Sequence, residues 1–265
     1  MLNIVVSVDT SLQAKIALEA ASRLSSQVRV QPVYVYDPPS RDIEFGAGWA
    51  RHSWEKETCQ QAQARIENLV LTQRDHCPDI KDPVLLKGDP FTKSAEFFMQ
   101  NQFDLLVVGV PFRNLDSVQL IHRFQTLARK EKKGLPLLII RQFNPIHGAV
   151  ILTDGGEAAE KALGLFLRFI PFLSAKIILI GLARAGDPSK EIQFLNLERG
   201  RAILKEKEVS AQGYTISELG YEGIKKEIET TDLLVCPVLS RDEPFNLSKF
   251  TLNKNQSGLF CIGQE

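Results

Sequence analysis

Residues 4–11 read IVVSVDTS, a short apolar run that ends in three polar residues. A run of this length and composition before a turn is typical of a buried β-strand. The three polar residues are types that cap helix N-termini, and apolar residues then recur at helical spacing from Ile16 to Leu24. A second apolar run follows at Val28–Tyr36. The segment therefore predicts a strand, a helix and a second strand in succession.

The same pattern returns in the second half of the chain. Residues 149–156 read AVILTDGG and lead into another helical apolar stripe and another apolar run, Ile177–Leu182. An aspartate directly before an all-apolar run also occurs twice, at Asp104 and at Asp232. Self-similarity over so long a period indicates a duplicated domain rather than a short-period repeat.

Strands alternating with helices, with near-continuous apolar strands, predict parallel βαβ units in sheets covered on both faces. We therefore predict two tandem, doubly wound α/β domains of Rossmann-like type, a first copy at residues 1–143 and a second copy at 147–265. Each copy ends in one more apolar strand, Leu135–Ile140 and Leu259–Ile262. We expect these two strands to lie beside each other, which would pair the domains within one chain and cover their edges.

The two copies differ in their middle parts. In the second copy we expect a strand at Tyr214–Glu218 and a helix at Glu222–Glu229. Most of the extra length of the first copy lies in residues 38–54, a segment that contains Trp49 and Trp54. This segment is either a surface loop that leads into a helix or a lid or interface patch.

Composition narrows the range of partners. The charges of the 32 basic and 32 acidic residues cancel, so there is no electrostatic reason to expect nucleic acid or an anionic membrane as a partner. A zero net charge also gives little repulsion between copies, which is compatible with a homodimer. The four cysteines form no Cys-x-x-Cys pair, as expected for free thiols in a reducing cytoplasm. No uncharged apolar run approaches the roughly 18–20 residues of a membrane span, and the N-terminal residues lack the basic segment of a signal peptide.

The order of these motifs, and their repetition, resembles the universal stress protein family. The matching stretches are VVSVDTS at residues 5–11, KGDP at 87–90, FDLLVVG at 103–109, VILTDGG at 150–156 and TDLLV at 231–235. Together the copies cover nearly all of the chain, which is similar to the tandem form of that family. The resemblance implies an adenine nucleotide alpha hydrolase-like fold, with ATP or AMP as the candidate ligand of the first copy.

The resemblance also implies where a nucleotide site would lie. In nucleotide-binding members, the aspartate after the first strand reads the adenine, the second strand contributes backbone contacts, and a glycine after the fourth strand starts a phosphate loop. Carried over, the site residues of the first copy are Val8, Asp9, Thr10, Val35, Gly109 and Val110. Those of the second copy are Asp154, Leu182 and Pro237.

The phosphate loop departs from the family pattern in both copies. Phosphate binding needs converging backbone N–H groups, which requires the conformational freedom of glycine. Residues 110–117 read VPFRNLDS, so Phe112 stands where the second glycine is expected, and Arg113 could hold a phosphate by charge or be a solvated loop residue. In the second copy Pro237 replaces the first glycine. We expect ATP binding to be lost in the second copy and lost or altered in the first.

The leading interpretation is a non-catalytic stress-response protein that binds a protein partner or a small ligand and requires no cofactor. Two alternatives are an adenine-nucleotide sensor that uses the first copy and a slow ATPase. We assign no catalytic residue and no metal ligand, because the sequence presents no nucleophile, acid–base pair or zinc-type spacing. Asp9 has two interpretations, recognition of a nucleobase and capping of a helix.

Overall fold

The computed structural model describes residues 1–9, 11–24, 27–36, 49–110, 117–141, 146–169, 176–183, 189–238 and 257–262. They form two compact units, Met1–Gly109 and Val110–Glu265. The repeat in the sequence predicts two domains that meet at residues 143–147. This lies later in the chain than the division between the two compact units. The units divide earlier because the strand that ends the first copy pairs with the last strand of the chain, inside the second unit.

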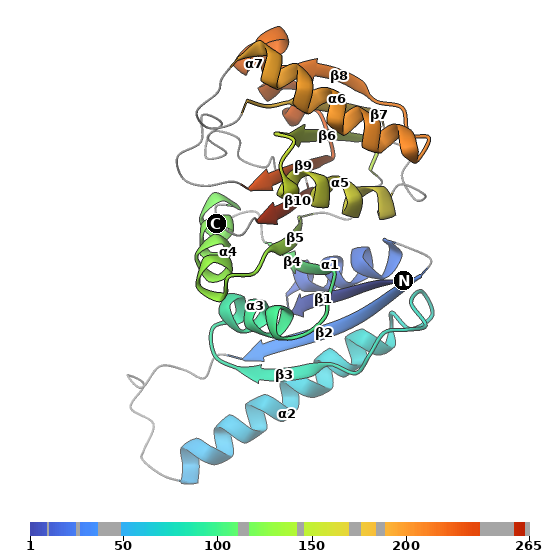
Figure 1. Cartoon of the computed structure of the whole chain (residues 1–265). Helices are drawn as coiled ribbons and strands as arrows, with labels where there is room; N and C mark the ends of the chain where they lie inside the picture. Colours follow the sequence, from blue (N-terminus) through green and yellow to red (C-terminus); the bar gives the residue numbers. More distant parts are fainter. Residues whose placement is uncertain are drawn as a thin grey trace. The chain divides into compact units, whose positions relative to one another are not determined.

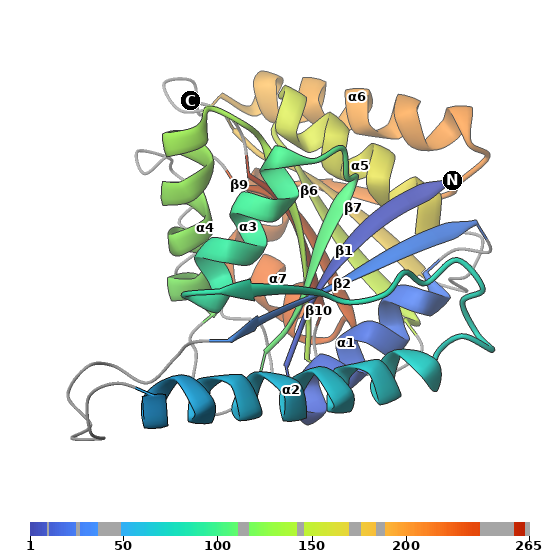
Figure 2. The same ribbon diagram turned by 90° about the horizontal axis from the view of Figure 1, so that it is seen from below.

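The first unit is a four-stranded parallel sheet with helices on both faces. Its elements are β1 (Leu2–Val8), α1 (Leu12–Arg23), β2 (Val28–Tyr36), α2 (Trp49–Leu71), β3 (Val84–Lys87), α3 (Pro90–Gln100) and β4 (Leu105–Gly109). The strand order is β3-β2-β1-β4. Helices α1 and α2 cover one face and α3 the other (Figures 1 and 2). Right-handed βαβ crossovers produce this arrangement when strands are added first on one side of β1 and then on its other side.

The second unit repeats this plan and adds two strands. Its elements are α4 (Ser117–Glu131), β5 (Leu135–Ile140), β6 (Gly148–Thr153), α5 (Glu157–Phe169), β7 (Lys176–Gly181), α6 (Lys190–Glu206), β8 (Gln212–Thr215), α7 (Ile216–Glu229), β9 (Leu233–Val238) and β10 (Ser257–Ile262). The order is β5-β10-β9-β6-β7-β8. All neighbours are parallel except β5 and β10, which run antiparallel with Leu135 opposite Ile262. The expected pairing of these two strands is confirmed.

The boundary between β8 and α7 corrects one prediction. A strand was expected at Tyr214–Glu218, but β8 ends at Thr215 and the helix begins at once. The cause is a capping box: the Thr215 hydroxyl accepts from the Glu218 amide at 3.3 Å, and the Glu218 carboxylate accepts from the Thr215 amide at 2.6 Å. The bonds that the Glu218 carboxylate accepts from the Thr215 amide and hydroxyl hold its pKa below the ordinary value. Gly220, with φ of 65°, then interrupts the helix.

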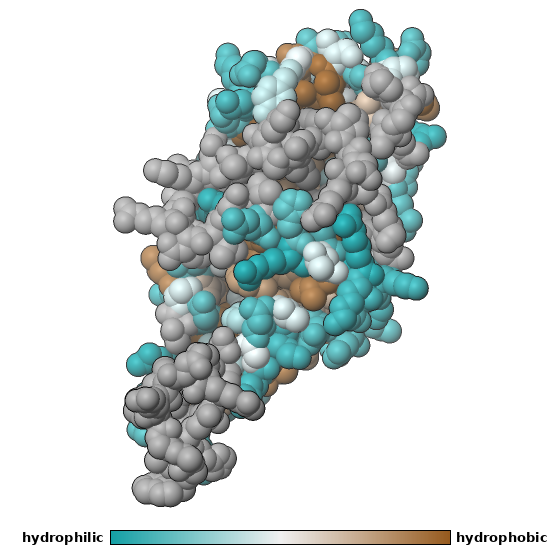
Figure 3. Space-filling view, turned by 90° about the vertical axis from the view of Figure 1, so that its left-hand side faces the viewer, coloured by the Kyte–Doolittle hydropathy of each residue, from teal (hydrophilic) through white to brown (hydrophobic). Residues whose placement is uncertain are grey.

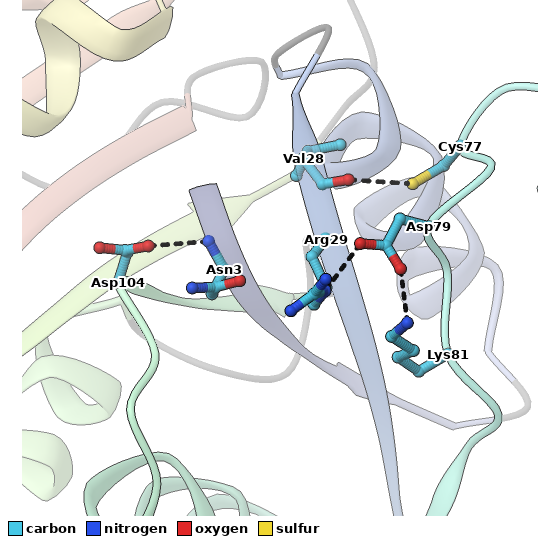
Figure 4. Close-up of polar contacts among 7 residues, drawn as sticks. All are labelled: Asn3, Val28, Arg29, Cys77, Asp79, Lys81 and Asp104. Atoms are coloured by element: carbon cyan, nitrogen blue, oxygen red, sulfur yellow. Dashed lines mark hydrogen bonds and ion pairs between the residues drawn. The ribbon is translucent and has the colours of Figure 1, made fainter. Parts of the chain in front are cut away.

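The aspartate that precedes an apolar run in each copy has a structural role. Asp104 accepts a hydrogen bond from the Asn3 amide at 2.7 Å, at the start of β1 (Figure 4). Asp232 accepts from the amides of His147 and Gly148, at 2.8 and 3.1 Å, at the start of β6. Each carboxylate thus joins the amino end of a central strand to the segment that leads into its neighbour, β4 or β9.

A second set of charges lies at the amino end of β2. Asp79 contacts the Arg29 side chain at 2.7 Å and the Lys81 ammonium at 2.6 Å (Figure 4). Beside it, the Cys77 thiol faces the Val28 carbonyl oxygen at 3.9 Å, and burial raises the pKa of this thiol. These contacts attach the segment after α2 to the sheet. The Lys81 and Arg29 side chains hold the pKa of Asp79 below its ordinary value.

We expect Asp79→Asn to lower the free energy of unfolding by about 0.5–1 kcal/mol at neutral pH, as is typical of half-exposed ion pairs. Because folding lowers the pKa of Asp79, its contribution is complete above the ordinary carboxyl pKa of about 3.9 and is lost as the pH falls through the lower folded value. The difference between wild type and variant in urea unfolding should therefore be constant from neutral to mildly acidic pH and shrink below about pH 4. Asp82→Asn, at a side chain that is 89% exposed, is the control. A difference that grew with acidification would contradict this account.

The exposed large apolar side chains among the described residues are Met1, Leu12, Leu71, Phe194, Leu195 and Tyr221. On the face drawn in Figure 3, hydrophobic surface appears as small areas bordered by hydrophilic side chains. Scattered exposure of this kind is ordinary for a folded domain. Within the described part of the chain, no helix combines the length and the apolar character needed to cross a membrane.

Candidate functional site

The carboxyl ends of the parallel strands are where ligands bind in open α/β sheets, so this edge of each unit is the candidate site. In the first unit β1 ends at Val8, and Asp9 follows with an exposed side chain. The Asp9 carboxylate accepts from the Ser11 amide at 2.7 Å, while Ser11 caps α1 by accepting from the Ala14 amide at 3.1 Å. Asp9 therefore shapes the turn and still presents a carboxylate to solvent. Thr10 lies outside the described residues.

Strand β2 brings a further polar group to the same edge. Val35, the predicted backbone contact, is 5% exposed. Its neighbour Tyr34 is paired in register with Val8, directly before Asp9. Burial, and then the negative charge of Asp9, raise the pKa of the Tyr34 phenol. Tyr34 was not predicted as a site residue, although the parallel pairing of β1 and β2 places it beside the predicted ones.

The end of β4 is held tightly against α1. A Cβ atom added to Gly109 would overlap the Gln13 carbonyl oxygen and lie 3.0 Å from the Ala14 amide nitrogen. Gly109 is therefore required for packing, whether or not it starts a phosphate loop. Val110 is 1% exposed, and its amide donates to the Ile140 carbonyl oxygen at 3.1 Å. Arg113 and the rest of residues 111–116 lie outside the described residues, so the altered phosphate loop stays a prediction.

The corresponding turn of the second unit is closed over its aspartate. Asp154 is 4% exposed and accepts from the Gly156 amide at 2.9 Å. The Thr153 hydroxyl accepts from the Gly155 amide at 3.2 Å. Gly155 has φ of +67°, a conformation that L-residues rarely adopt. Asp9 is exposed and Asp154 is buried, so the two copies differ at the position that the resemblance assigns to base recognition.

Helix α6 engages the backbone of Leu182, the predicted contact that follows β7. The Leu182 amide donates to the Thr153 carbonyl oxygen at 2.7 Å. The Leu182 carbonyl oxygen accepts from the Asn196 carboxamide at 2.9 Å. One turn further along α6, Arg199 reaches the Gly155 carbonyl oxygen at 3.5 Å. Both polar backbone groups of Leu182 are therefore hydrogen-bonded within the protein.

Asn196 and Arg199 were missed by the sequence analysis, although a signal for Asn196 was present. Buried residues recur on α6 at Gln193, Asn196, Leu197 and Gly200, which is helical spacing. A polar residue within such a stripe needs a hydrogen-bond partner, and its partner here is Leu182. Pro237, also predicted, lies buried in β9 opposite Cys261 of β10 and has no backbone N–H to offer.

The polar groups at these edges differ between the two copies. The first copy offers an exposed carboxylate and a neighbouring phenol, while the second copy offers polar groups that are already hydrogen-bonded. Among the described residues, no group of three or more His, Cys, Asp and Glu side chains is placed to hold a metal ion. The thiol of Cys261 is buried, which raises its pKa to about 12 and keeps it protonated at neutral pH.

Known proteins were compared with the chain by sequence and by structure, and only the structures are similar. No known family's sequence profile matches the chain, and no curated protein matches it significantly. A universal stress protein from Archaeoglobus fulgidus DSM 4304 aligns with a TM-score of 0.63 at 11% identity, over 99% of this chain and 98% of that one. A putative universal stress protein from Pseudomonas aeruginosa UCBPP-PA14 aligns with a TM-score of 0.52 at 12% identity, over 97% and 92%.

A third structure is similar over a comparable length. The cytoplasmic domain of a prokaryotic cation chloride cotransporter aligns with a TM-score of 0.53 at 10% identity, over 99% of this chain and 95% of that one. At such identities the likeness concerns the fold and not the site chemistry. Together with the repeated βαβ units described above, these matches show that the chain has the fold of a tandem universal stress protein.

Proposed function

We propose that this chain is a non-catalytic binding protein of the universal stress type, whose first copy faces a small ligand or protein partner. The observation that carries the proposal is the difference between the two aspartates. Asp9 presents an exposed carboxylate at the carboxyl edge of the first unit, whereas Asp154 is 4% exposed. A buried group that is already hydrogen-bonded is a poor site for a new ligand, because binding would have to break existing contacts.

Non-catalytic action is supported by the kinds of groups at this edge. A carboxylate and a phenol with a raised pKa can accept and donate hydrogen bonds, but they supply no activated nucleophile. The zero formal charge gives no electrostatic reason for nucleic acid or a membrane surface as a partner. The four free cysteines support a reducing, cytoplasmic location. The zero formal charge also gives little repulsion between copies of the chain, which supports a homodimer as one arrangement.

A second candidate function is an adenine-nucleotide sensor in the first copy, with ATP or AMP as its ligand. The specific support is the exposed Asp9 next to Tyr34, since a carboxylate can accept the amino group of an adenine while an aromatic ring packs nearby. In this function Val8, Val35 and Gly109 would line the same edge. The proposed ligand would be held mainly through its base, because residues 110–117 lack the glycines of a phosphate loop.

The test is a thermal-shift series with ATP, ADP and AMP, after mass spectrometry of small molecules released from the natively purified protein. A ligand that binds only the folded state raises the melting temperature, by about 4 °C for each kcal/mol in a unit the size of Met1–Gly109. If the sensor function holds, the shift should be lost in Asp9→Ala and retained in Asp154→Ala. The second variant is the matched control because it removes the equivalent but buried carboxylate.

The outcomes separate the candidate functions. Released nucleotide, or a shift that depends on Asp9, would make the first copy a nucleotide sensor. No nucleotide and no shift would reject the sensor and direct the search to other ligands and protein partners. Steady release of phosphate from ATP, abolished by Asp9→Ala, would overturn the non-catalytic proposal in favour of a slow ATPase.

A further inference from the structure

A cluster of basic side chains lies where α4 leads into β5. Residues 129–133 read RKEKK, which places four basic residues and one acidic residue in five positions of a chain with zero net charge. Arg129 and Lys130 belong to the last turn of α4, and Lys132 and Lys133 follow the end of the helix. All four side chains are exposed. The local excess of positive charge therefore faces solvent.

A fifth cation reaches this place from another helix. Lys161 is an exposed residue of α5, and α4 and α5 both pack against β10 (Figure 1). A Cβ atom added to Gly134 would lie 3.8 Å from the Lys161 ammonium nitrogen and 3.3 Å from the Ile262 carbonyl oxygen. Lys161 therefore meets the turn between α4 and β5 one residue beyond Lys133. The name basic corner is used below for five side chains: Arg129, Lys130, Lys132, Lys133 and Lys161.

Helix electrostatics explain only part of the basic corner. The macrodipole stabilises basic residues in the last turn of a helix, which accounts for Arg129 and Lys130. Lys161 lies in the N-terminal half of α5, where the macrodipole does not favour a cation. Lys132 has φ of 51°, a conformation in which glycine is more stable than lysine. The stability of the fold therefore explains neither Lys132 nor Lys161.

Four cations of the basic corner form no ion pair with another described residue. Exposed cations elsewhere in the protein do so, as Arg23 does with Glu19 at 2.8 Å. The basic-corner residues without such a pair in the described part of the chain are Arg129, Lys130, Lys132 and Lys161. Like charges that are held close together repel one another, so this arrangement costs stability until negative charge is bound beside it.

We propose that the basic corner is a docking surface for an acidic segment of a partner protein. Closely spaced carboxylates on such a segment match cations that come from two helices and a turn, and complementary charge of this kind speeds association and sets partner choice. The surface belongs to the second unit, so this inference goes beyond the proposed function, which concerns the first copy.

The extent of the basic corner favours a short acidic segment over a longer polyanion. Proteins that bind duplex DNA commonly neutralise about six to ten phosphates, more than this surface has cations. Because the net charge of the chain is zero, the rest of the chain is negative and repels a long polyanion or an anionic membrane. Insertion into a membrane would also need an exposed apolar face. The apolar face of α4 is buried at Leu120, Ile121, Phe124 and Ala128.

The test is binding of a fluorescein-labelled hexaglutamate peptide to the full chain, measured by fluorescence anisotropy at about 50 mM salt. Lys161→Gln and Lys132→Gly should each weaken binding about two- to fivefold, as expected for exposed ion pairs. Raising the salt to about 0.5 M should abolish most of the binding, because it screens exposed charges. Lys207→Gln is the control: it removes one charge from an exposed lysine flanked by Glu206 and Glu208, and should leave the affinity unchanged.

Lys132→Gly separates a docking role from a structural one. Glycine relieves the positive φ, so this variant should melt about 2–4 °C above wild type while it binds the peptide more weakly. Glu208→Gly is the matched control, because Glu208 follows α6 with φ of 58° and the same pattern of backbone hydrogen bonds. It should gain similar stability and keep the affinity of wild type. A Lys132→Gly variant that bound as tightly as wild type would contradict the proposal.

The remaining outcomes also decide the question. No binding of hexaglutamate at low salt, or equal binding by all variants, would overturn the proposal. Single-stranded DNA or vesicles of anionic phospholipid that bound more tightly than hexaglutamate, and less tightly to Lys161→Gln, would also overturn it in favour of nucleic acid or a membrane surface. None of these measurements involves Asp9, so the proposed function stands or falls separately.

Discussion

Replacing Gly109 by alanine is expected to lower the free energy of unfolding of the first unit by about 3 kcal/mol. The added Cβ would overlap the Gln13 carbonyl oxygen and lie 2.5 Å from the Gln13 carbonyl carbon. Both atoms belong to the backbone of the first turn of α1, so no side-chain rotation relieves the overlap. The end of β4 and the start of α1 must therefore separate, which loosens the edge where Asp9 lies.

Urea unfolding followed by far-UV circular dichroism measures this effect, with Gly164→Ala as the control. A Cβ atom added to Gly164, in the exposed middle of α5, would have no neighbour within 4 Å. Alanine there should be neutral or stabilise by up to about 1 kcal/mol, because glycine is unfavourable inside a helix. Gly181→Ala should behave like Gly109→Ala, since its Cβ would overlap the Gln193 carbonyl oxygen. Equal stability of the Gly109 and Gly164 variants would refute the close approach of β4 to α1.

Asp232→Ala is expected to destabilise the second unit by about 2–3 kcal/mol. The Asp232 carboxylate accepts two backbone hydrogen bonds, from His147 and Gly148, and hydrogen bonds to charged groups are the stronger ones. Its loss frees the amino end of β6, the strand that lies between β9 and β7. Asp104→Ala should destabilise the first unit as well, because the Asp104 carboxylate accepts the hydrogen bond from the Asn3 amide at 2.7 Å.

Chemical denaturation of both variants, with Asp75→Ala for comparison, tests this repeated structural role. Asp75 is exposed, and its replacement should change stability by no more than about 0.5 kcal/mol. Because the chain has two units, each variant should shift the transition of the unit that contains it. If Asp232→Ala behaved like Asp75→Ala, the aspartate before the apolar run would not be a structural residue.

The repeated aspartates and glycines show why a motif can have a structural role and a site role at once. Asp104 and Asp232 contribute to the resemblance to universal stress proteins, yet they lie at the amino ends of the strands, away from the candidate site. Gly109 contributes to the resemblance as the start of a phosphate loop, and packing against α1 alone already requires it. The fold by itself therefore requires these residues, whether or not a ligand binds.

The sequence by itself determined the succession of strands and helices, the duplication and the pairing of Leu135–Ile140 with Leu259–Ile262. These features depend on apolar periodicity and on local capping residues, which act within a few positions along the chain. The boundary at Thr215 was also a local signal, since a threonine followed three residues later by Glu218 forms a capping box. This local signal ends β8 at Thr215, three residues before the expected end of the strand.

Only the tertiary structure decided the difference between the two candidate sites. The burial of Asp154 and the bond from Asn196 to Leu182 depend on how α6 lies against β6 and β7. Asp9, in the first unit, is exposed. Asn196 and Leu182 are too far apart in the sequence for a local pattern to predict their contact. Many other groups could also form the hydrogen bond that a buried carboxamide needs. Short-range patterns specify which elements form, whereas the contents of a site depend on side chains that meet only after those elements have packed.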